Sequence, residues 1–119
     1  MAKVLVTDDS RFMRKALRNI FEKFGHQVIE AENGAVALEQ YEKEKPDLIT
    51  LDITMPVMNG MECLQIIHDK YPEAKVIMLT AMGQQPLVLE SIKLGAKDFI
   101  VKPLKTDVVM ESVYRVLSM

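Results

Sequence analysis

The chain has 119 residues, of which 49% are hydrophobic and 27% are charged, and its formal net charge at pH 7 is −2. This length suits one compact globular domain, and the slightly acidic balance argues against duplex DNA as the main partner. No apolar stretch approaches the roughly 20 residues of a membrane-spanning helix, and a single cysteine, Cys63, excludes an internal disulfide. We therefore expect a cytoplasmic protein that binds neither membranes nor nucleic acid.

Strand-like and helix-like patterns alternate five times along the chain. Short segments rich in Val, Ile and Leu predict strands at residues 3–7, 27–31, 47–52, 75–80 and 98–101. Longer segments predict helices at residues 10–24, 34–44, 60–70, 84–94 and 105–118. Gly25 and Gly95 stand where the first and fourth helices should end, and Asn59 with Glu62 is typical of a capping box at the start of the third.

Five strand–helix units with nearly continuous apolar strands imply an α/β protein, in which helices cover both faces of a parallel sheet. Right-handed crossovers leave only a few doubly wound topologies. One of them, the order 2-1-3-4-5, makes the first and third strands neighbours. No linker, repeat or low-complexity segment interrupts the chain, so we expect a single domain over residues 1–119 with no output domain.

Four of the predicted strands end in polar or charged side chains. Asp8 and Asp9 follow the first strand, Asp52 closes the third, Thr80 closes the fourth, and Lys102 follows the fifth. In an open α/β sheet, ligands bind at the carboxyl ends of the strands. Three carboxylates, a hydroxyl and an ammonium at that edge indicate a site for a phosphoryl group and a divalent metal ion.

Each of these residue types suits a role in phosphoryl transfer. Asp52 is the candidate nucleophile, because a carboxylate can accept a phosphoryl group as an acyl phosphate. Asp8, Asp9 and Asp52 offer the hard oxygen ligands that Mg²⁺ prefers, while Lys102 and Thr80 can contact phosphoryl oxygens. Ordinary roles stay open for them as well, as a helix cap for the acidic pair and as strand ends for Lys102 and Thr80.

Taken together, these motifs resemble the receiver domain of two-component response regulators along essentially the whole chain. The resemblance rests on Asp8-Asp9, Asp52-Ile53-Thr54-Met55-Pro56, Asn59-Gly60, Thr80-Ala81 and Lys102-Pro103. Residues 81–85 and 95–103 are also similar to the stand-alone receivers of bacterial chemotaxis. The resemblance implies a flavodoxin-like, doubly wound (βα)5 fold with the strand order 2-1-3-4-5.

The resemblance also implies an activity and a switch. A receiver accepts a phosphoryl group from a sensor histidine kinase, here onto Asp52 with Mg²⁺, and then changes its binding to a downstream target such as a flagellar motor switch protein. The backbone carbonyl of Thr54 is implied as a further metal ligand. Thr80 is implied to move toward the phosphoryl group while Phe99 turns between exposed and buried positions, although an ordinary core role for Phe99 stays open.

Two details near the site follow from the same resemblance. The bond between Lys102 and Pro103 is implied to be cis. Thr54 and Met82 occupy the positions that tune hydrolysis of the acyl phosphate in receivers, and neither side chain is an obvious water-activating base. We expect a monomer that catalyses only its own phosphorylation and dephosphorylation, is no turnover enzyme, and has a phosphatase among its partners.

Three other functions compete with this one. A phosphorelay intermediate, which passes its phosphoryl group to a histidine phosphotransfer domain, would use the same site and stays open. A flavodoxin-like electron carrier is rejected because the acidic segment Thr7-Asp8-Asp9-Ser10 would repel a flavin phosphate. A haloacid-dehalogenase phosphatase is rejected because the first strand does not end in a D-x-D pattern.

The fourth helix is a candidate for partner binding because it is apolar in more than one direction. Val88 and Ile92 share one side, Leu87 and Leu94 share another, and Leu89 lies on a third. A helix that packs on a sheet needs one apolar stripe. The surplus predicts an output surface with the fifth strand and helix, although scattered surface leucines are also ordinary.

The first helix carries a second candidate surface, a cluster of basic residues. These are Arg11, Arg14, Lys15 and Arg18. They can meet an acidic patch on a kinase or a phosphotransfer partner, or they can form a solvated helix face.

Overall fold

The structure of the protein is a computed structural model and describes residues 1–81 and 84–119. Along the chain, its elements are β1 (Lys3–Thr7), α1 (Arg11–Lys23), β2 (Gln27–Ala31), α2 (Gly34–Glu44), β3 (Leu48–Asp52), α3 (Gly60–Lys70), β4 (Val76–Thr80), α4 (Gln85–Lys93), β5 (Asp98–Val101) and α5 (Thr106–Leu117). The predicted alternation of strands and helices is confirmed, and each predicted limit lies within one residue of the observed one.

The five strands form one parallel sheet in the order β2-β1-β3-β4-β5, as predicted. Its register matters for function, because Thr7 on β1 pairs with Leu51 on β3. The next residue on each strand is an aspartate, Asp8 on one and Asp52 on the other. The sheet therefore brings together side chains that lie 44 positions apart in sequence.

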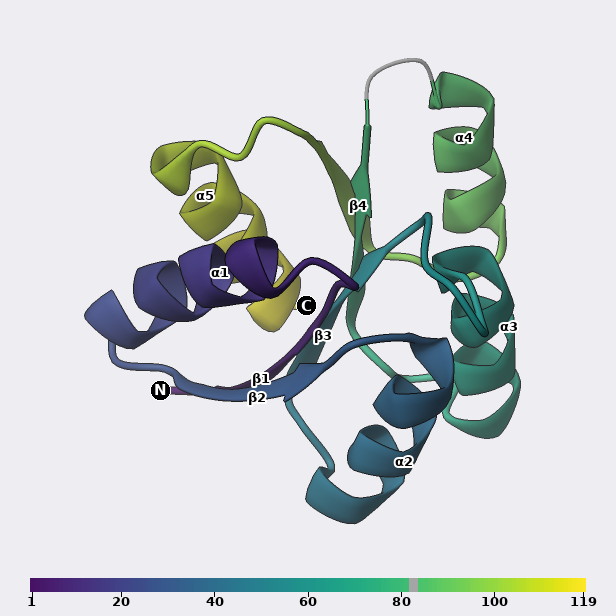
Figure 1. Ribbon diagram of the computed structural model, residues 1–119, viewed down its shortest axis with the longest axis horizontal. Helices are drawn as coiled ribbons and strands as arrows, with labels where there is room; N and C mark the ends of the chain where they lie inside the picture. The colour runs from purple at the N-terminus through teal and green to yellow at the C-terminus, as the bar shows by residue number, and fades with distance from the viewer. Residues whose placement is uncertain (82–83) are drawn as a thin grey trace.

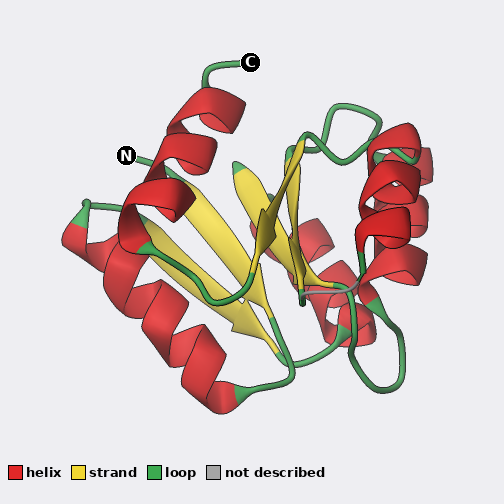
Figure 2. Ribbon diagram, turned by 90° about the horizontal axis from the view of Figure 1, so that it is seen from above, coloured by secondary structure: helices red, strands yellow, loops and turns green. Residues whose placement is uncertain are grey.

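Helices cover both faces of the sheet, which accounts for strands that are apolar on both sides (Figures 1 and 2). Helices α1 and α5 lie on one face, where the buried side chains include Val6, Leu17, Phe21 and Val113. Helices α2, α3 and α4 lie on the other face, where the buried side chains include Leu5, Leu51, Leu64 and Ile67. In the part of the chain that the structure describes, no helix is long and apolar enough to cross a bilayer.

Three of the five helix starts follow from a capping side chain in the local sequence. Ser10, Asn33 and Asn59 each cap a helix by accepting a hydrogen bond from the backbone N–H three residues on, and Glu62 completes the predicted capping box at α3. The N-cap residues of α4 and α5, Gln84 and Lys105, make no capping bond with their side chains. The Gln84 amide turns toward the candidate site instead.

Candidate functional site

The carboxyl ends of β1 and β3 hold a cluster of three carboxylates. One oxygen from each of Asp8, Asp9 and Asp52 can be chosen so that the three lie within 4.8 Å of one another. Asp8 is fully buried and Asp52 is nearly so, whereas Asp9 is exposed. Buried carboxylates this close repel one another strongly, and a divalent cation relieves that repulsion. The donor set therefore fits Mg²⁺, with Asp9 on the solvent side.

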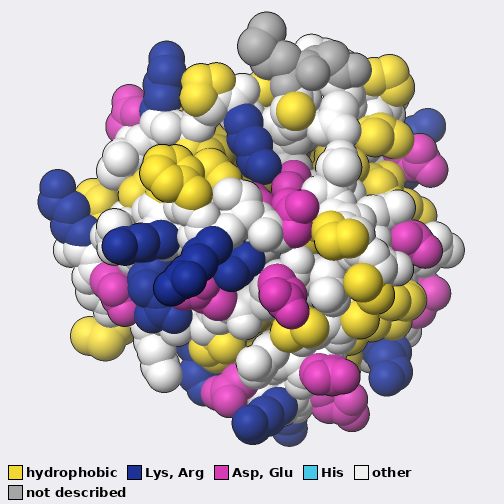
Figure 3. Space-filling view, in the orientation of Figure 1, with side chains coloured by type: hydrophobic (Ala, Val, Ile, Leu, Met, Phe, Trp, Pro, Cys, Tyr) yellow, Lys and Arg dark blue, Asp and Glu magenta, His cyan; other side chains and the backbone are white. Residues whose placement is uncertain are grey.

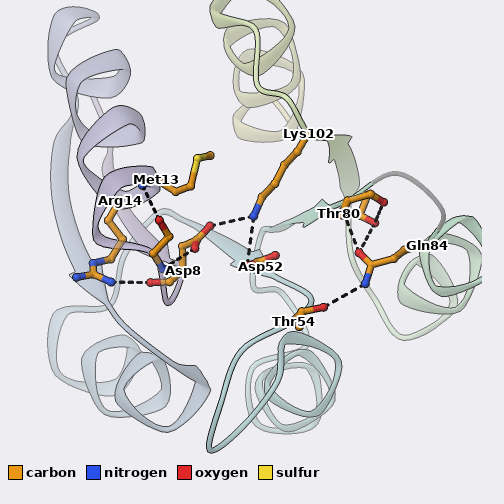
Figure 4. A network of polar contacts seen from close by, with 10 residues as sticks. Asp8, Met13, Arg14, Asp52, Thr54, Thr80, Gln84 and Lys102 are labelled. Atoms are coloured by element: carbon orange, nitrogen blue, oxygen red, sulfur yellow. Dashed lines mark hydrogen bonds and ion pairs between the residues drawn. The ribbon is translucent and has the colours of Figure 1, made fainter.

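Lys102 joins this cluster from the opposite end of the chain. Its Nζ lies 3.3 Å from Asp8 Oδ2 and 3.3 Å from Asp52 Oδ2. Figure 4 shows both contacts. The backbone N–H of Lys102 donates to the Thr80 carbonyl at 2.8 Å, which continues the contact between β4 and the end of β5. The bond to Pro103 is cis, as the resemblance implied. One ammonium thus faces two buried carboxylates and leaves the cluster negatively charged.

The environment of Asp52 disfavours its ionised form. Burial, followed by the negative charge of Asp8, raises the pKa of Asp52 above its usual value, while Lys102 opposes the shift. A cation that binds beside Asp52 would stabilise the ionised form of this carboxyl group.

The loop after β3 is pressed close to the site. A Cβ atom on Gly60 would lie 2.1 Å from the backbone oxygen of Asp52, so only glycine allows the start of α3 to approach this closely. The Gly60 N–H donates to the Ile53 carbonyl at 2.9 Å and closes the loop. Thr54 lies on this loop, two residues after Asp52, and its proposed role as a metal ligand through the backbone carbonyl stays a prediction.

A glutamine side chain connects this loop to the end of β4 (Figure 4). Gln84 Oε1 lies 3.0 Å from the Thr80 hydroxyl and accepts from the Ala81 N–H at 2.9 Å. Its Nε2 donates to the Thr54 hydroxyl at 3.1 Å. Thr80 itself is buried, so its hydroxyl is held by protein groups at the edge of the site.

Comparison with known proteins agrees with this geometry. The model of the response regulator receiver domain matches residues 4–114. The chain belongs to this family. A chemotaxis protein CheY of Listeria monocytogenes is 53% identical over 113 residues, which cover 94% of this chain and 95% of its own. A Bacillus subtilis protein named CcdB is 52% identical over 118 residues, covering 98% of each chain.

A solved structure extends the likeness to three dimensions. CheY in the CheX–CheY–BeF3–Mg²⁺ complex of Borrelia burgdorferi superimposes with a TM-score of 0.92 at 42% identity. The match covers 96% of this chain and 87% of that one. The flavodoxin-like fold of a receiver domain is thus confirmed, together with the order of its strands.

Behind Thr80, this receiver has an apolar groove of about 330 Å³ between α4 and β5. Val88, Leu89, Ile92 and Phe99 contribute to its lining. Phe99 is 39% exposed, so it lies at the surface and not in the core. The ordinary core role left open for Phe99 is therefore wrong, and its motion on activation stays a prediction.

The predicted output surface needs a correction. Among the three leucines proposed for it, only Leu89 is largely exposed, at 63%. Leu87 and Leu94 are half-buried and pack against the core on the α3 side of the sheet. The reason is that α4 covers the edge of the sheet beside α3 (Figure 1). The side of α4 that carries Leu87 and Leu94 therefore packs against the core. Ile92 and Phe99 extend the exposed apolar surface beside Leu89.

The basic cluster on α1 is also partly paired, although Lys and Arg side chains gather over this helix in Figure 3. Arg14 Nε lies 3.0 Å from Glu30 Oε1, and Arg18 Nε lies 2.7 Å from Glu30 Oε2. Burial alone would raise the pKa of Glu30, but the hydrogen bonds from Arg18 and Arg14 outweigh it and lower the pKa. Arg11 and Lys15 are exposed and remain the candidates for contact with a partner.

Two contributions to the site were missed in the sequence. Arg14 was predicted only as a surface charge, yet its Nη1 donates to the Asp8 carbonyl at 2.8 Å and holds the acidic pair in place. Gln84 was predicted only as a helix end. The available signal was its position as the residue before α4, where Ser, Asp or Asn would be the usual cap. Met82, predicted to tune hydrolysis, lies outside the described residues.

Proposed function

We propose that this protein is a phosphorylation-operated switch of the chemotaxis type, which accepts a phosphoryl group on Asp52 and then changes its affinity for a downstream protein. The observation that carries the proposal is the cluster of Asp8, Asp9 and Asp52 with Lys102 beside it. This arrangement supplies a nucleophile, ligands for a cation and a positive charge within one small site.

The chemistry is a transfer between two protein side chains. A carboxylate oxygen of Asp52 attacks phosphorus, an O–P bond forms, and the N–P bond to the kinase histidine breaks, leaving the electron pair on the imidazole nitrogen. Mg²⁺, when bound, supplies the positive charge that lets the anionic phosphoryl group approach the carboxylates. Asp8, Asp9 and Asp52 would hold it, and the backbone carbonyl of Thr54 is a further candidate ligand.

The remaining site residues position charge around the transferred group. Lys102 already faces Asp52, so its ammonium can shift from that carboxylate to a phosphoryl oxygen. Thr80 can donate its hydroxyl proton to another oxygen once the hydroxyl turns toward the site. These roles change the protein itself and release no product other than phosphate, so we propose no turnover activity.

The partners follow from the family and from the relatives. A sensor histidine kinase is the proposed phosphoryl donor, and a protein of the flagellar motor switch is the proposed target. CheX accompanies the Borrelia CheY in its complex, and a phosphatase is a further proposed partner here. A phosphorelay intermediate would use the same residues, but no feature of this site favours it over the switch.

Labelling with a small phosphoryl donor tests the acceptor. Radiolabelled acetyl phosphate should label the wild-type protein in the presence of Mg²⁺, and an excess of chelator should prevent it. Asp52→Asn should abolish the label, because an amide cannot form the acyl phosphate. Asp69→Asn, which alters an exposed aspartate on α3, should label normally. Label that persists in Asp52→Asn would place the acceptor on another residue and refute the proposed site.

A further inference from the structure

We propose that Gln84 is a positioning residue that holds Thr80 in its resting place and thereby sets how readily the protein switches. The inference rests on the proposed function, because it concerns the same phosphoryl site. In this proposal, the Gln84 side chain restrains the Thr80 hydroxyl, and this restraint must be released when the protein switches.

The contacts of Gln84 span the mouth of the site. Its amide oxygen is 3.0 Å from the Thr80 hydroxyl and 2.9 Å from the Ala81 nitrogen, and its amide nitrogen is 3.1 Å from the Thr54 hydroxyl. Thr80 ends β4 and Thr54 follows Asp52, so one side chain links the end of β4 to the loop that follows the proposed acceptor (Figure 4).

The orientation of this amide is determined by its partners. The backbone nitrogen of Ala81 can only donate a hydrogen bond, so it must face the oxygen of the Gln84 amide and not the nitrogen. The amide nitrogen is then directed to Thr54, whose hydroxyl oxygen accepts. The Thr80 hydroxyl therefore meets an acceptor and donates its proton to Gln84 or to the Ala81 carbonyl, 3.1 Å away.

The Gln84 side chain does not act as a helix cap. The N-cap side chains of α1, α2 and α3 accept hydrogen bonds from their own helices, whereas Gln84 makes no such bond to α4 and Lys105 makes none to α5. A cap normally contributes to helix stability. At α4 the side chain is directed to the switch residue instead, which is expected of a positioning residue and not of a helix cap.

The single hydroxyl proton of Thr80 limits how the protein can switch. A hydroxyl has one proton, so Thr80 cannot donate to Gln84 and to a phosphoryl oxygen at once. When the Thr80 hydroxyl donates to Gln84, activation must break that hydrogen bond, which stabilises only the resting state. Removing it should shift the equilibrium toward the active state, since a two-state equilibrium responds to interactions that differ between its states.

Titration with Mg²⁺ and beryllofluoride, which mimics a phosphoryl group on the acceptor, tests the inference. Gln84→Ala should bind beryllofluoride about threefold to tenfold more tightly than wild type, the factor expected for one lost hydrogen bond. Gln85→Ala is the matched control, because Gln85 is the exposed neighbour and its side chain makes no hydrogen bond to the residues that the structure describes. It should bind with wild-type affinity.

Two further variants separate the contacts of the amide. Gln84→Met keeps the length of the side chain without hydrogen bonds and should behave as Gln84→Ala. Thr54→Val removes only the contact to the loop after β3 and should give a smaller gain. As a spectroscopic signature, hydrogen exchange at the Ala81 amide should accelerate in Gln84→Ala and not in Gln85→Ala, because Gln84 is its acceptor.

The outcomes distinguish this inference from the proposed function. If wild type fails to bind beryllofluoride in Mg²⁺, the proposed phosphoryl site falls and the inference falls with it. If wild type binds but Gln84→Ala binds equally or more weakly, only the restraint on Thr80 is overturned. Equal gains in Gln84→Ala and Gln85→Ala would also overturn it, since the effect would then belong to the helix terminus.

Discussion

Val57 shows how much local strain the loop after Asp52 carries. Its φ is +66°, a region that is unfavourable for a β-branched residue, and the Met58 N–H donates to the Pro56 carbonyl at 2.7 Å across it. A hydrogen bond between residues two apart, around a positive φ, marks a tight and strained three-residue turn. Val57 is 82% exposed, so packing does not compensate it. The strain lies between Asp52 and the close approach at Gly60.

Replacing Val57 with asparagine should stabilise the protein. Asparagine tolerates a positive φ far better than a β-branched residue, so Val57→Asn should raise the free energy of unfolding by on the order of 1 kcal/mol. Urea denaturation measures the change. The same substitution at Val108, an exposed position on α5, should not stabilise, because a helical backbone gives asparagine no such advantage. A less stable Val57→Asn would show that the strain is absent in solution.

At the scale of elements, His26 connects the start of the sheet to the end of α1. Its Nδ1 accepts a hydrogen bond from the Ala2 N–H at 3.0 Å, and its ring packs edge-on against Phe21. Burial, and next the positive charge of the N-terminus, lower the pKa of His26 below its ordinary value of 6.5. Protonation of Nδ1 would break the bond to Ala2, so the fold favours neutral His26.

This contact should make stability depend on pH. A depressed folded-state pKa means that the contribution is complete above pH 6.5 and is lost as the pH falls through this value toward the folded-state pKa. The melting temperature of wild type should therefore fall more steeply between about pH 7 and pH 5 than that of His26→Asn, which keeps an acceptor but does not titrate. Both proteins retain His68, so the difference between their slopes isolates His26. Parallel slopes would contradict the prediction.

At the scale of the whole molecule, the acidic cluster exists only because the sheet holds it together. The core on both faces of the sheet stabilises the register between β1 and β3, and this register places the buried carboxylates of Asp8 and Asp52 side by side. The raised pKa of Asp52 reflects the cost of ionising it there. Cation binding that requires this assembly must stabilise the folded state, since an unfolded chain does not hold the carboxylates together.

Mg²⁺ should therefore raise the melting temperature, and the increase should depend on Asp9. At a concentration about 100 times its dissociation constant, the ion should add about 2.7 kcal/mol to the free energy of unfolding. Asp9→Ala should lose most of this shift and be at least as stable as wild type without metal, because one repelling charge is gone. Asp69→Ala should keep the full shift. Calorimetry in Mg²⁺ and in chelator measures all three proteins. A full metal shift in Asp9→Ala would remove Asp9 from the predicted ligands.

The limits of the strands and helices could be predicted from the sequence because their causes are local. Runs of Val, Ile and Leu, the capping box of Asn59 and Glu62, and the glycines after α1 and α4 act within a few residues. The polar residues at the strand ends were readable for a related reason. Parallel strands bring their carboxyl ends to one edge whatever packs on their faces, so the convergence of Asp8, Asp52 and Lys102 followed from the topology.

Only the tertiary structure decided which side chains were free to act. Leu87 and Leu94 looked like surplus surface on the helix, but the placement of α4 beside α3 buries them against the core. Arg14 and Arg18 were predicted as part of a basic cluster, but both form ion pairs with Glu30 on β2. The link from Gln84 to Thr54 spans 30 residues and two loops. Periodicity describes one element at a time, whereas burial, pairing and restraint depend on which elements pack together, so they became visible only once the sheet and helices were assembled.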